Sequence, residues 1–147
     1  MMEAGNTMSA GASILIVDDD IVLARAFSLA LQGAGYNPRP AHSAEEALRQ
    51  LASAPPDAII LDFRMPLING VGFLYRLRNQ PQYEHTPVMV VTGESYLTDE
   101  VREELRTLKA EVRLKPIGLD DLLEWTRMLV ESGPVSAPPA ARPQPGA

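Results

Sequence analysis

Four short β-rich apolar runs in this chain each stop abruptly at a polar residue. The runs end, in chain order, at Asp18, Asp62, Thr92 and Lys115. Apolar runs of this length are typical of strands that are buried on both faces of a parallel sheet. The carboxyl ends of parallel strands meet at one edge of the sheet, and open α/β sheets place their chemistry there. We therefore expect three or more carboxylates, a hydroxyl and an ammonium group to share one pocket.

Helical patterns alternate with these strands. We expect strands at about 13–17, 36–41, 58–61, 87–92 and 111–114, and helices at about 21–32, 43–54, 71–79, 97–109 and 119–131. Ser43 with Glu46 three residues later is a capping box that opens the second helix. Thr98 is the expected N-cap of the fourth helix. Pro38 and Pro40 remove two backbone donors, which indicates an edge position for the second strand. Five βα units with right-handed crossovers follow from this alternation.

The bulk properties exclude several classes of protein. A length of 147 residues suits one domain with its own core. The net charge of −6 lacks the basic footprint of a nucleic-acid-binding protein, so we expect no direct DNA binding. The absence of cysteine excludes disulfides, thiol catalysis and thiolate metal sites. We find no signal peptide and no apolar run long enough to span a bilayer, so we expect a cytoplasmic protein without membrane insertion.

The two ends of the chain differ in composition from its centre. Residues 1–11 are small and polar, and we expect them to be disordered. Residues 133–147 are rich in proline and alanine, a composition that forms neither a helix nor a core. This segment is read as a disordered tail or as the start of a linker. The compact domain is therefore expected to span residues 12–132.

The acidic run Asp18-Asp19-Asp20 is expected to lie beside Asp62 at the sheet edge. Carboxylates packed this closely repel one another, and a hard divalent cation is the usual remedy. The alternative is a purely structural role, in which the run only caps the following helix through its N-terminal amides. Asp20 suits that capping role, which would leave the other two carboxylates for a metal ion.

Taken together, these motifs resemble the receiver domain of bacterial two-component response regulators over about residues 13–132. They occur in the family's order: the acidic pair, Asp-x-x-Met-Pro at 62–66, Thr92-Gly93, and Lys115-Pro116. Each motif alone is weak evidence, whereas all of them in order at these spacings are specific. The resemblance implies a flavodoxin-like, doubly wound α/β fold similar to a chemotaxis regulator. Its five parallel strands would lie in the order 2-1-3-4-5, with five helices.

The resemblance also implies aspartyl phosphorylation. Asp62 matches the phosphoacceptor, which takes a phosphoryl group from a phosphohistidine on a histidine kinase or a histidine phosphotransferase. It implies that Mg²⁺, or alternatively Mn²⁺, is held by Asp18, Asp19, Asp62 and the backbone carbonyl of Arg64. The register could instead use Asp19 and Asp20, but we prefer Asp18 and Asp19 because the apolar strand ends just before them.

Further roles follow from the same resemblance. Thr92 and Gly93 match the phosphate-binding and switch positions, and Lys115 matches the lysine that contacts the acceptor and later a phosphoryl oxygen. The peptide before Pro116 is expected to be cis. Taken alone, Thr92 would be an ordinary β-branched strand residue and Lys115 an ordinary surface lysine.

Two residues of the fifth strand depart from the family pattern. The switch position that usually carries Tyr or Phe holds Val112, and the next residue is the charged Arg113. The long stem of Arg113 could lie along apolar surface while its charged end reaches water. The route from the site to the output surface is therefore expected to be atypical.

Arg64 and Glu94 each lie two residues after a site residue and are expected to flank the phosphate. One hypothesis is that they pair across the mouth of the site, obstruct the hydrolytic water and so set the lifetime of the phosphate. The alternative is two solvated rim charges, worth at most about 1 kcal/mol as an exposed pair.

The function expected from these features is that of a phosphoacceptor signalling domain. Phosphorylation would shift the domain between two conformations and so change its binding to an unknown downstream target. We expect a stand-alone receiver, a monomer or weak dimer and not a turnover enzyme, since residues after 132 leave no room for an effector. The alternatives are a degenerate receiver that binds without phosphorylation and a receiver excised from a longer regulator. An aspartyl phosphatase and a flavin-binding flavodoxin of related fold fit the motifs less well.

Overall fold

The computed structural model describes residues 11–93, 95 and 97–134. Five strands form one sheet: β1 (Ser13–Val17), β2 (Asn37–Ala41), β3 (Ala58–Asp62), β4 (Val88–Thr92) and β5 (Ala110–Leu114). All neighbours are parallel, and the strand order is β2-β1-β3-β4-β5. The helices are α1 (Ile21–Gly33), α2 (Ala44–Ser53), α3 (Gly70–Arg78), α4 (Asp99–Thr107) and α5 (Leu119–Ser132), with a short 3₁₀ helix η2 (Pro81–Tyr83). The predicted flavodoxin-like fold is confirmed.

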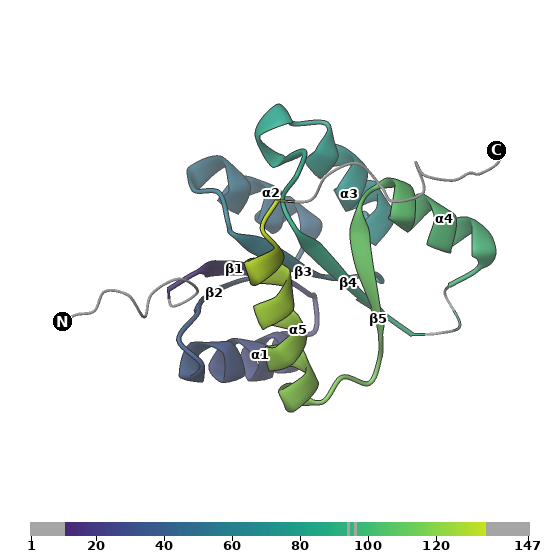
Figure 1. Ribbon diagram of the computed structural model, residues 1–147. Coiled ribbons are helices and arrows are strands. Elements are labelled where there is room, and N and C mark those ends of the chain that lie inside the picture. Colours follow the sequence, from purple (N-terminus) through teal and green to yellow (C-terminus); the bar gives the residue numbers. More distant parts are fainter. Residues whose placement is uncertain (1–10, 94, 96, 135–147) are drawn as a thin grey trace.

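Helices cover both faces of the sheet (Figure 1). Because side chains alternate along a strand, Ile14 and Ile16 of β1 face α1 and α5, whereas Leu15 and Val17 face the other helices. Each face builds its own buried apolar cluster around residues of the three central strands. This two-sided burial explains why β1, β3 and β4 are almost continuously apolar.

The helix starts follow the expected capping chemistry, with one difference. The Ser43 side chain accepts a hydrogen bond from the Glu46 amide at 3.0 Å, and Thr98 accepts one from the Val101 amide at 3.1 Å, as predicted. The carboxylate of Glu46, however, accepts from the amide of His42 at 2.9 Å. The second hydrogen bond of the capping box therefore uses the amide of the residue before the N-cap and not the amide of the N-cap itself.

Element boundaries differ from the sequence expectation by one or two residues. Helix α3 begins at Gly70, since Asn69 provides the cap by accepting from the Gly72 amide at 3.0 Å. Helix α4 ends at Thr107, two residues early, because Lys109 adopts a positive φ of 62° that a helix cannot continue. Strand β2 lies at one edge of the sheet, as its prolines predicted.

A half-buried arginine at the end of α3 ties distant loops together. The Arg78 guanidinium donates to the carbonyl oxygens of Tyr83 at 2.9 Å, Thr86 at 2.7 Å, Leu108 at 2.9 Å and Lys109 at 3.2 Å. Burial lowers the pKa of Arg78 to about 10, so it stays charged at neutral pH. One side chain thus provides a hydrogen-bond donor for carbonyl groups at three places: the end of η2, the loop before β4 and the residues that follow α4.

Replacing Arg78 by Met should lower the free energy of unfolding by about 3 kcal/mol, because several carbonyl groups would lose their donor. Equilibrium denaturation with urea measures the change. Arg76→Met is the matched control on the exposed face of the same helix and should change stability by less than about 0.5 kcal/mol. Equal effects of the two substitutions would show that Arg78 does not hold these loops.

Candidate functional site

A cavity of about 350 Å³ lies at the carboxyl edge of the sheet. It is lined by Asp18, Asp19, Asp20, Asp62, Arg64, Thr92, Gly93 and Lys115. The structure therefore brings together the predicted metal, acceptor and phosphate-binding residues in one place. Glu94, which we expected to pair with Arg64, lies outside the described residues.

The strand register explains this convergence. Val17 of β1 pairs with Leu61 of β3, so Asp18 and Asp62 follow at the same level on neighbouring strands. Asp62 in turn pairs with Val91 of β4, one residue before Thr92. Sequence positions that are more than 70 residues apart therefore meet because parallel strands end together.

The centre of the site is an ion pair between Asp62 and Lys115. The Lys115 Nζ lies 2.8 Å from Oδ1 of Asp62, whose residue is only 5% exposed. The Lys115 ammonium is thus the charged group that contacts this buried oxygen. A carboxylate held in this way keeps unused lone pairs, which suits it to a further cation or to attack on an electrophile.

Burial dominates the ionisation of the site. It raises the pKa of Asp62, against the lowering effect of the Lys115 ammonium. It also raises the pKa of Asp18 to about 6, although a hydrogen bond from the Asp20 amide opposes the rise. Partial burial alone would lower the pKa of Lys115, but its pairing with Asp62 and the other carboxylates raises it. The site thus carries more negative charge than one ammonium can neutralise.

The acidic run divides its roles by geometry. Oδ1 of Asp20 accepts from the Leu23 amide at 3.0 Å and caps α1. Oδ1 of Asp18 accepts from the Asp20 amide at 2.9 Å, while Asp19 stays exposed. One oxygen each from Asp18, Asp19 and Asp62 lies within 4.8 Å of the others. This geometry favours Asp18 and Asp19 over the alternative register, since Asp20 is engaged with the helix.

The donor set fits a hard divalent cation. The cluster offers three carboxylate oxygens, one each from Asp18, Asp19 and Asp62. Oxygen ligands of this kind are preferred by Mg²⁺ and Mn²⁺ and are poorly suited to softer metals. The acidic pocket therefore has the chemistry of a magnesium site.

The hydroxyl of Thr92 is buried and turned toward its own chain. It donates to the carbonyl oxygen of Gly93 at 3.3 Å, a long hydrogen bond that a better acceptor could replace. The Lys115–Pro116 peptide is cis, and Lys115 donates its amide to the Thr92 carbonyl at 2.8 Å. Thr92 and Lys115 are thus held next to each other by the β4–β5 ladder.

The two unusual residues of β5 face opposite sides of the sheet. Val112 packs against the apolar cluster that includes α3 and α4. The guanidinium of Arg113 lies 5.0 Å from the centre of the Trp125 ring on α5, a cation–π contact. Sequence reasoning missed this pair. The available sequence signals were the charged Arg113 in the fifth strand and the single Trp of the chain in the last helix.

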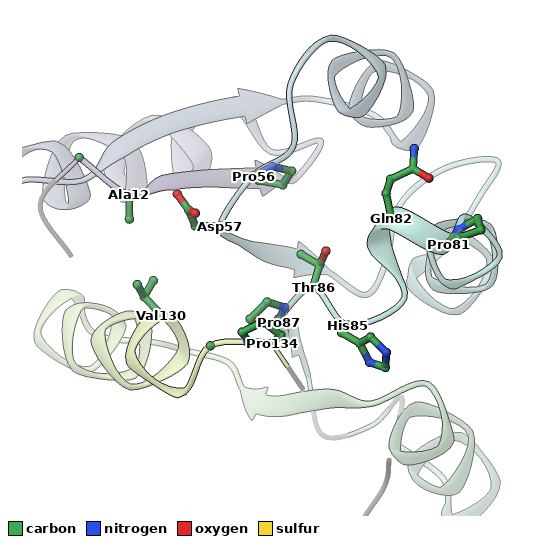
Figure 2. A pocket seen from close by; sticks show the side chains of 12 residues that line it. Ala12, Pro56, Asp57, Pro81, Gln82, His85, Thr86, Pro87, Val130 and Pro134 are labelled. Carbon is green, nitrogen blue, oxygen red and sulfur yellow. The ribbon is translucent and has the colours of Figure 1, made fainter. Parts of the chain in front are cut away.

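A larger cavity of about 540 Å³ lies at the opposite, amino edge of the sheet (Figure 2). Its lining includes Pro56, Asp57, His85, Pro87 and Val130. Asp57 is the one carboxylate among these residues, and it accepts the Ser13 amide at 2.7 Å. The larger cavity therefore has fewer carboxylates in its lining, and the smaller acidic cavity is the better candidate for the functional site.

The fold and the acidic edge together define a flavodoxin-like domain with an acidic site at the carboxyl edge of its sheet. A family model described as "Response regulator receiver domain" matches residues 14–127, so the chain belongs to the receiver domain family of two-component response regulators. Among the described residues, no helix combines the length and the apolar character that a bilayer span requires.

Curated relatives and solved structures agree with this assignment. The response regulators MprA of Mycobacterium ulcerans and Mycobacterium tuberculosis are each 34% identical over 120 residues, which cover 80% of this chain. The chain spans about half the length of these relatives, 49% and 50% respectively. Chemotaxis protein CheY4 of Vibrio cholerae matches with a TM-score of 0.75 and 34% identity, covering 82% of this chain and 99% of that one. A putative response regulator from Chloroflexus aurantiacus matches with a TM-score of 0.74 and 31% identity, covering 82% and 98%.

The raised pKa of Asp18 predicts how stability depends on pH without metal. The folded-state pKa of about 6 exceeds the ordinary value of 3.8, so this group favours folding most at low pH. Its contribution should be lost as the pH rises through about 6. In EDTA, wild type should therefore lose up to about 3 kcal/mol of stability relative to Asp18→Asn between pH 4 and pH 7. Urea denaturation of both proteins across this range measures the difference.

The asparagine keeps an oxygen that can accept from the Asp20 amide, so the comparison isolates the charge. Excess MgCl₂ at neutral pH should stabilise wild type more than Asp18→Asn. Parallel stability curves for the two proteins from pH 4 to pH 7 would contradict the burial of an ionisable Asp18.

Proposed function

We propose that this chain is a phosphoacceptor receiver in which Asp62 takes a phosphoryl group from a phosphohistidine. The observation that supports this most is the buried Asp62 carboxylate, paired with Lys115 at 2.8 Å in a cavity that also holds Thr92 and the acidic pair. Family membership supplies the reaction class, and the acidic pair, Asp62, Thr92 and Lys115 lie together as the resemblance implies. The domain is a signalling module and not a turnover enzyme, because it accepts one phosphoryl group and holds it.

The transfer needs little covalent chemistry from the protein. An Asp62 oxygen attacks phosphorus, the phosphorus–nitrogen bond to the donor imidazole breaks, and an acyl phosphate forms. Lys115 favours the ionised carboxylate, against the effect of burial, and can then donate to a phosphoryl oxygen. Positioning and charge neutralisation are what such a site contributes.

Asp18, Asp19, Asp62 and the backbone carbonyl of Arg64 would hold Mg²⁺ or Mn²⁺. When bound, the cation neutralises charge on the transferring phosphoryl group. Asp20 remains the cap of α1 throughout.

Phosphorylation gives the Thr92 hydroxyl a new acceptor. Its long bond to the Gly93 carbonyl would exchange for a charge-assisted bond to a phosphoryl oxygen. Because this contact exists in only one state, it biases the population between two conformations. The altered conformation then changes binding to a downstream protein.

Helix α1 supports a helical protein as the phosphodonor, either a histidine kinase or a histidine phosphotransferase. Val22 is 78% exposed and Leu29 is 59% exposed, seven residues apart on one side of the helix. This second apolar stripe faces away from the core and suits a histidine-bearing helix.

The proposed domain comprises residues 12–132, with segments 1–11 and 133–147 outside it, in a cytoplasmic protein. The receiver chemistry is the same for a stand-alone protein and for part of a longer regulator. This chain spans only about half the length of the MprA relatives, so the alternative of a receiver excised from a longer regulator is retained.

Incubation with acetyl phosphate and Mg²⁺ should add one phosphoryl group to wild type, detected by intact-mass spectrometry. Asp62→Asn should show no such gain, because the amide cannot form an acyl phosphate. Asp57→Asn is the matched control at the other end of β3, and it should label like wild type.

Failure of wild type to label, with its fold intact by circular dichroism, would favour the degenerate receiver. The observation that supports the degenerate receiver as a second candidate is Val112, which stands in place of the usual aromatic residue. Labelling of Asp62→Asn equal to wild type would instead place the acceptor elsewhere.

Arg64 lines the mouth of the cavity and is proposed, with Glu94, to limit access of the hydrolytic water. Arg64→Ala should therefore shorten the lifetime of the acyl phosphate several-fold. The decay of phosphorylated protein after removal of acetyl phosphate measures the rate. A decay rate equal to that of wild type would make Arg64 an ordinary solvated rim charge.

A further inference from the structure

Leu67, in the loop between β3 and α3, is the most exposed large apolar side chain in the described part of the molecule. Its relative exposure is 102%, whereas the hydrophobic residues around it, Phe63 and Met65, are buried. Single exposed apolar residues are common on protein surfaces and need no explanation by themselves. The backbone conformation of this one is what distinguishes it.

Leu67 occupies the centre of a strained turn. Its φ is 72°, and the amide of Ile68 donates to the carbonyl of Pro66 at 2.8 Å, two residues earlier. A three-residue turn with this bond and a positive central φ is the rare, strained form of the γ-turn. Glycine or asparagine would adopt this φ more readily than leucine.

The flanking residues hold the turn in place. Met65 is buried, and Ile68 packs against the same apolar cluster as α2, α3 and α4. Met65 and Ile68 thus anchor the two sides of the turn in the core, while Pro66 and Leu67 between them are exposed. The chain therefore accepts backbone strain at a residue whose side chain gains no burial within the described residues. Uncompensated strain of this kind concentrates at sites of function.

The location indicates what contacts Leu67. It lies five residues after Asp62 and three after Arg64, which lines the acidic cavity. Strands β1 and β3 are paired, so this loop and the start of α1 leave neighbouring strands at the same edge. There Ile21 is 62% exposed and follows the cavity-lining Asp20 directly. Leu67 and Ile21 thus lie beside the cavity that a protein delivering a phosphohistidine to Asp62 would have to reach.

We infer that Leu67 is a docking and specificity residue for the protein phosphodonor. Its side chain enters an apolar hollow beside the phosphohistidine of the donor helix, and burial in the complex compensates for the strain of the free loop. This inference rests on the proposed function of Asp62, because it needs a protein donor. It assigns Leu67 no part in the chemistry at phosphorus.

Small and large phosphodonors separate docking from chemistry. Leu67→Asn removes the apolar side chain and suits the positive φ, whereas Leu67→Met keeps an apolar side chain in the same turn. The protein donor is an autophosphorylated histidine kinase, chosen from a panel as the one that phosphorylates wild type fastest. The small donor is acetyl phosphate, and both assays use the full chain.

Leu67→Asn should reduce the second-order rate of transfer from the kinase roughly tenfold. The reduction should appear at subsaturating receiver and vanish at saturation, because only docking is lost. Labelling by acetyl phosphate should be unchanged, and the midpoint of thermal unfolding should be equal or higher since strain is relieved. Leu67→Met should transfer at close to the wild-type rate.

Two outcomes would overturn the inference. Transfer to Leu67→Asn at the wild-type rate shows that the donor does not contact this residue, and a lowered unfolding midpoint shows that Leu67 acts in folding. Failure of the proposed function looks different, because wild type would then not be labelled by acetyl phosphate at all.

Discussion

The contact on which the site depends is the ion pair between Asp62 and Lys115. It lies inside a cavity whose carboxylates outnumber the ammonium group that pairs with Asp62. Strands that are apolar on both faces leave polar residues no position except the sheet edge, and parallel register brings those edges together. One ammonium offsets only part of the negative charge, and burial raises the pKa of Asp62 and of Asp18. The excess charge makes the site receptive to a cation, and the remaining lone pairs of Asp62 make it receptive to phosphorus.

Sequence reasoning reached this site because its signals are local. Each apolar run ends at the residue that matters, so the run lengths alone placed Asp18, Asp62 and Thr92 at one edge. The caps Ser43 and Thr98 were equally readable, since a cap bonds only three residues ahead. Strand order and register needed the family resemblance, because no local pattern specifies which parallel strands become neighbours.

What could not be predicted depends on tertiary distances. Arg78 bonds to carbonyl groups of four residues, and a carbonyl has no sequence signature. The stacking of Arg113 on Trp125 joins a strand to a helix and requires knowing that both face the same side of the sheet. The turn at Leu67 was missed for the opposite reason, since leucine is among the residues least expected at positive φ.

The packing around α4 bears on how the site could signal without an aromatic at Val112. Helix α4 is strongly polar, and Leu105 is its one fully buried residue. An element with so few buried apolar contacts is displaced at low free-energy cost. Its C-terminal end is tied by Arg78 to the carbonyls of Leu108 and Lys109, whereas its N-terminal end follows the chain from Thr92. Leu97 and Val101 near its N-terminal end pack, partly buried, against the same apolar cluster as Val112, so any displacement of α4 must shift these contacts.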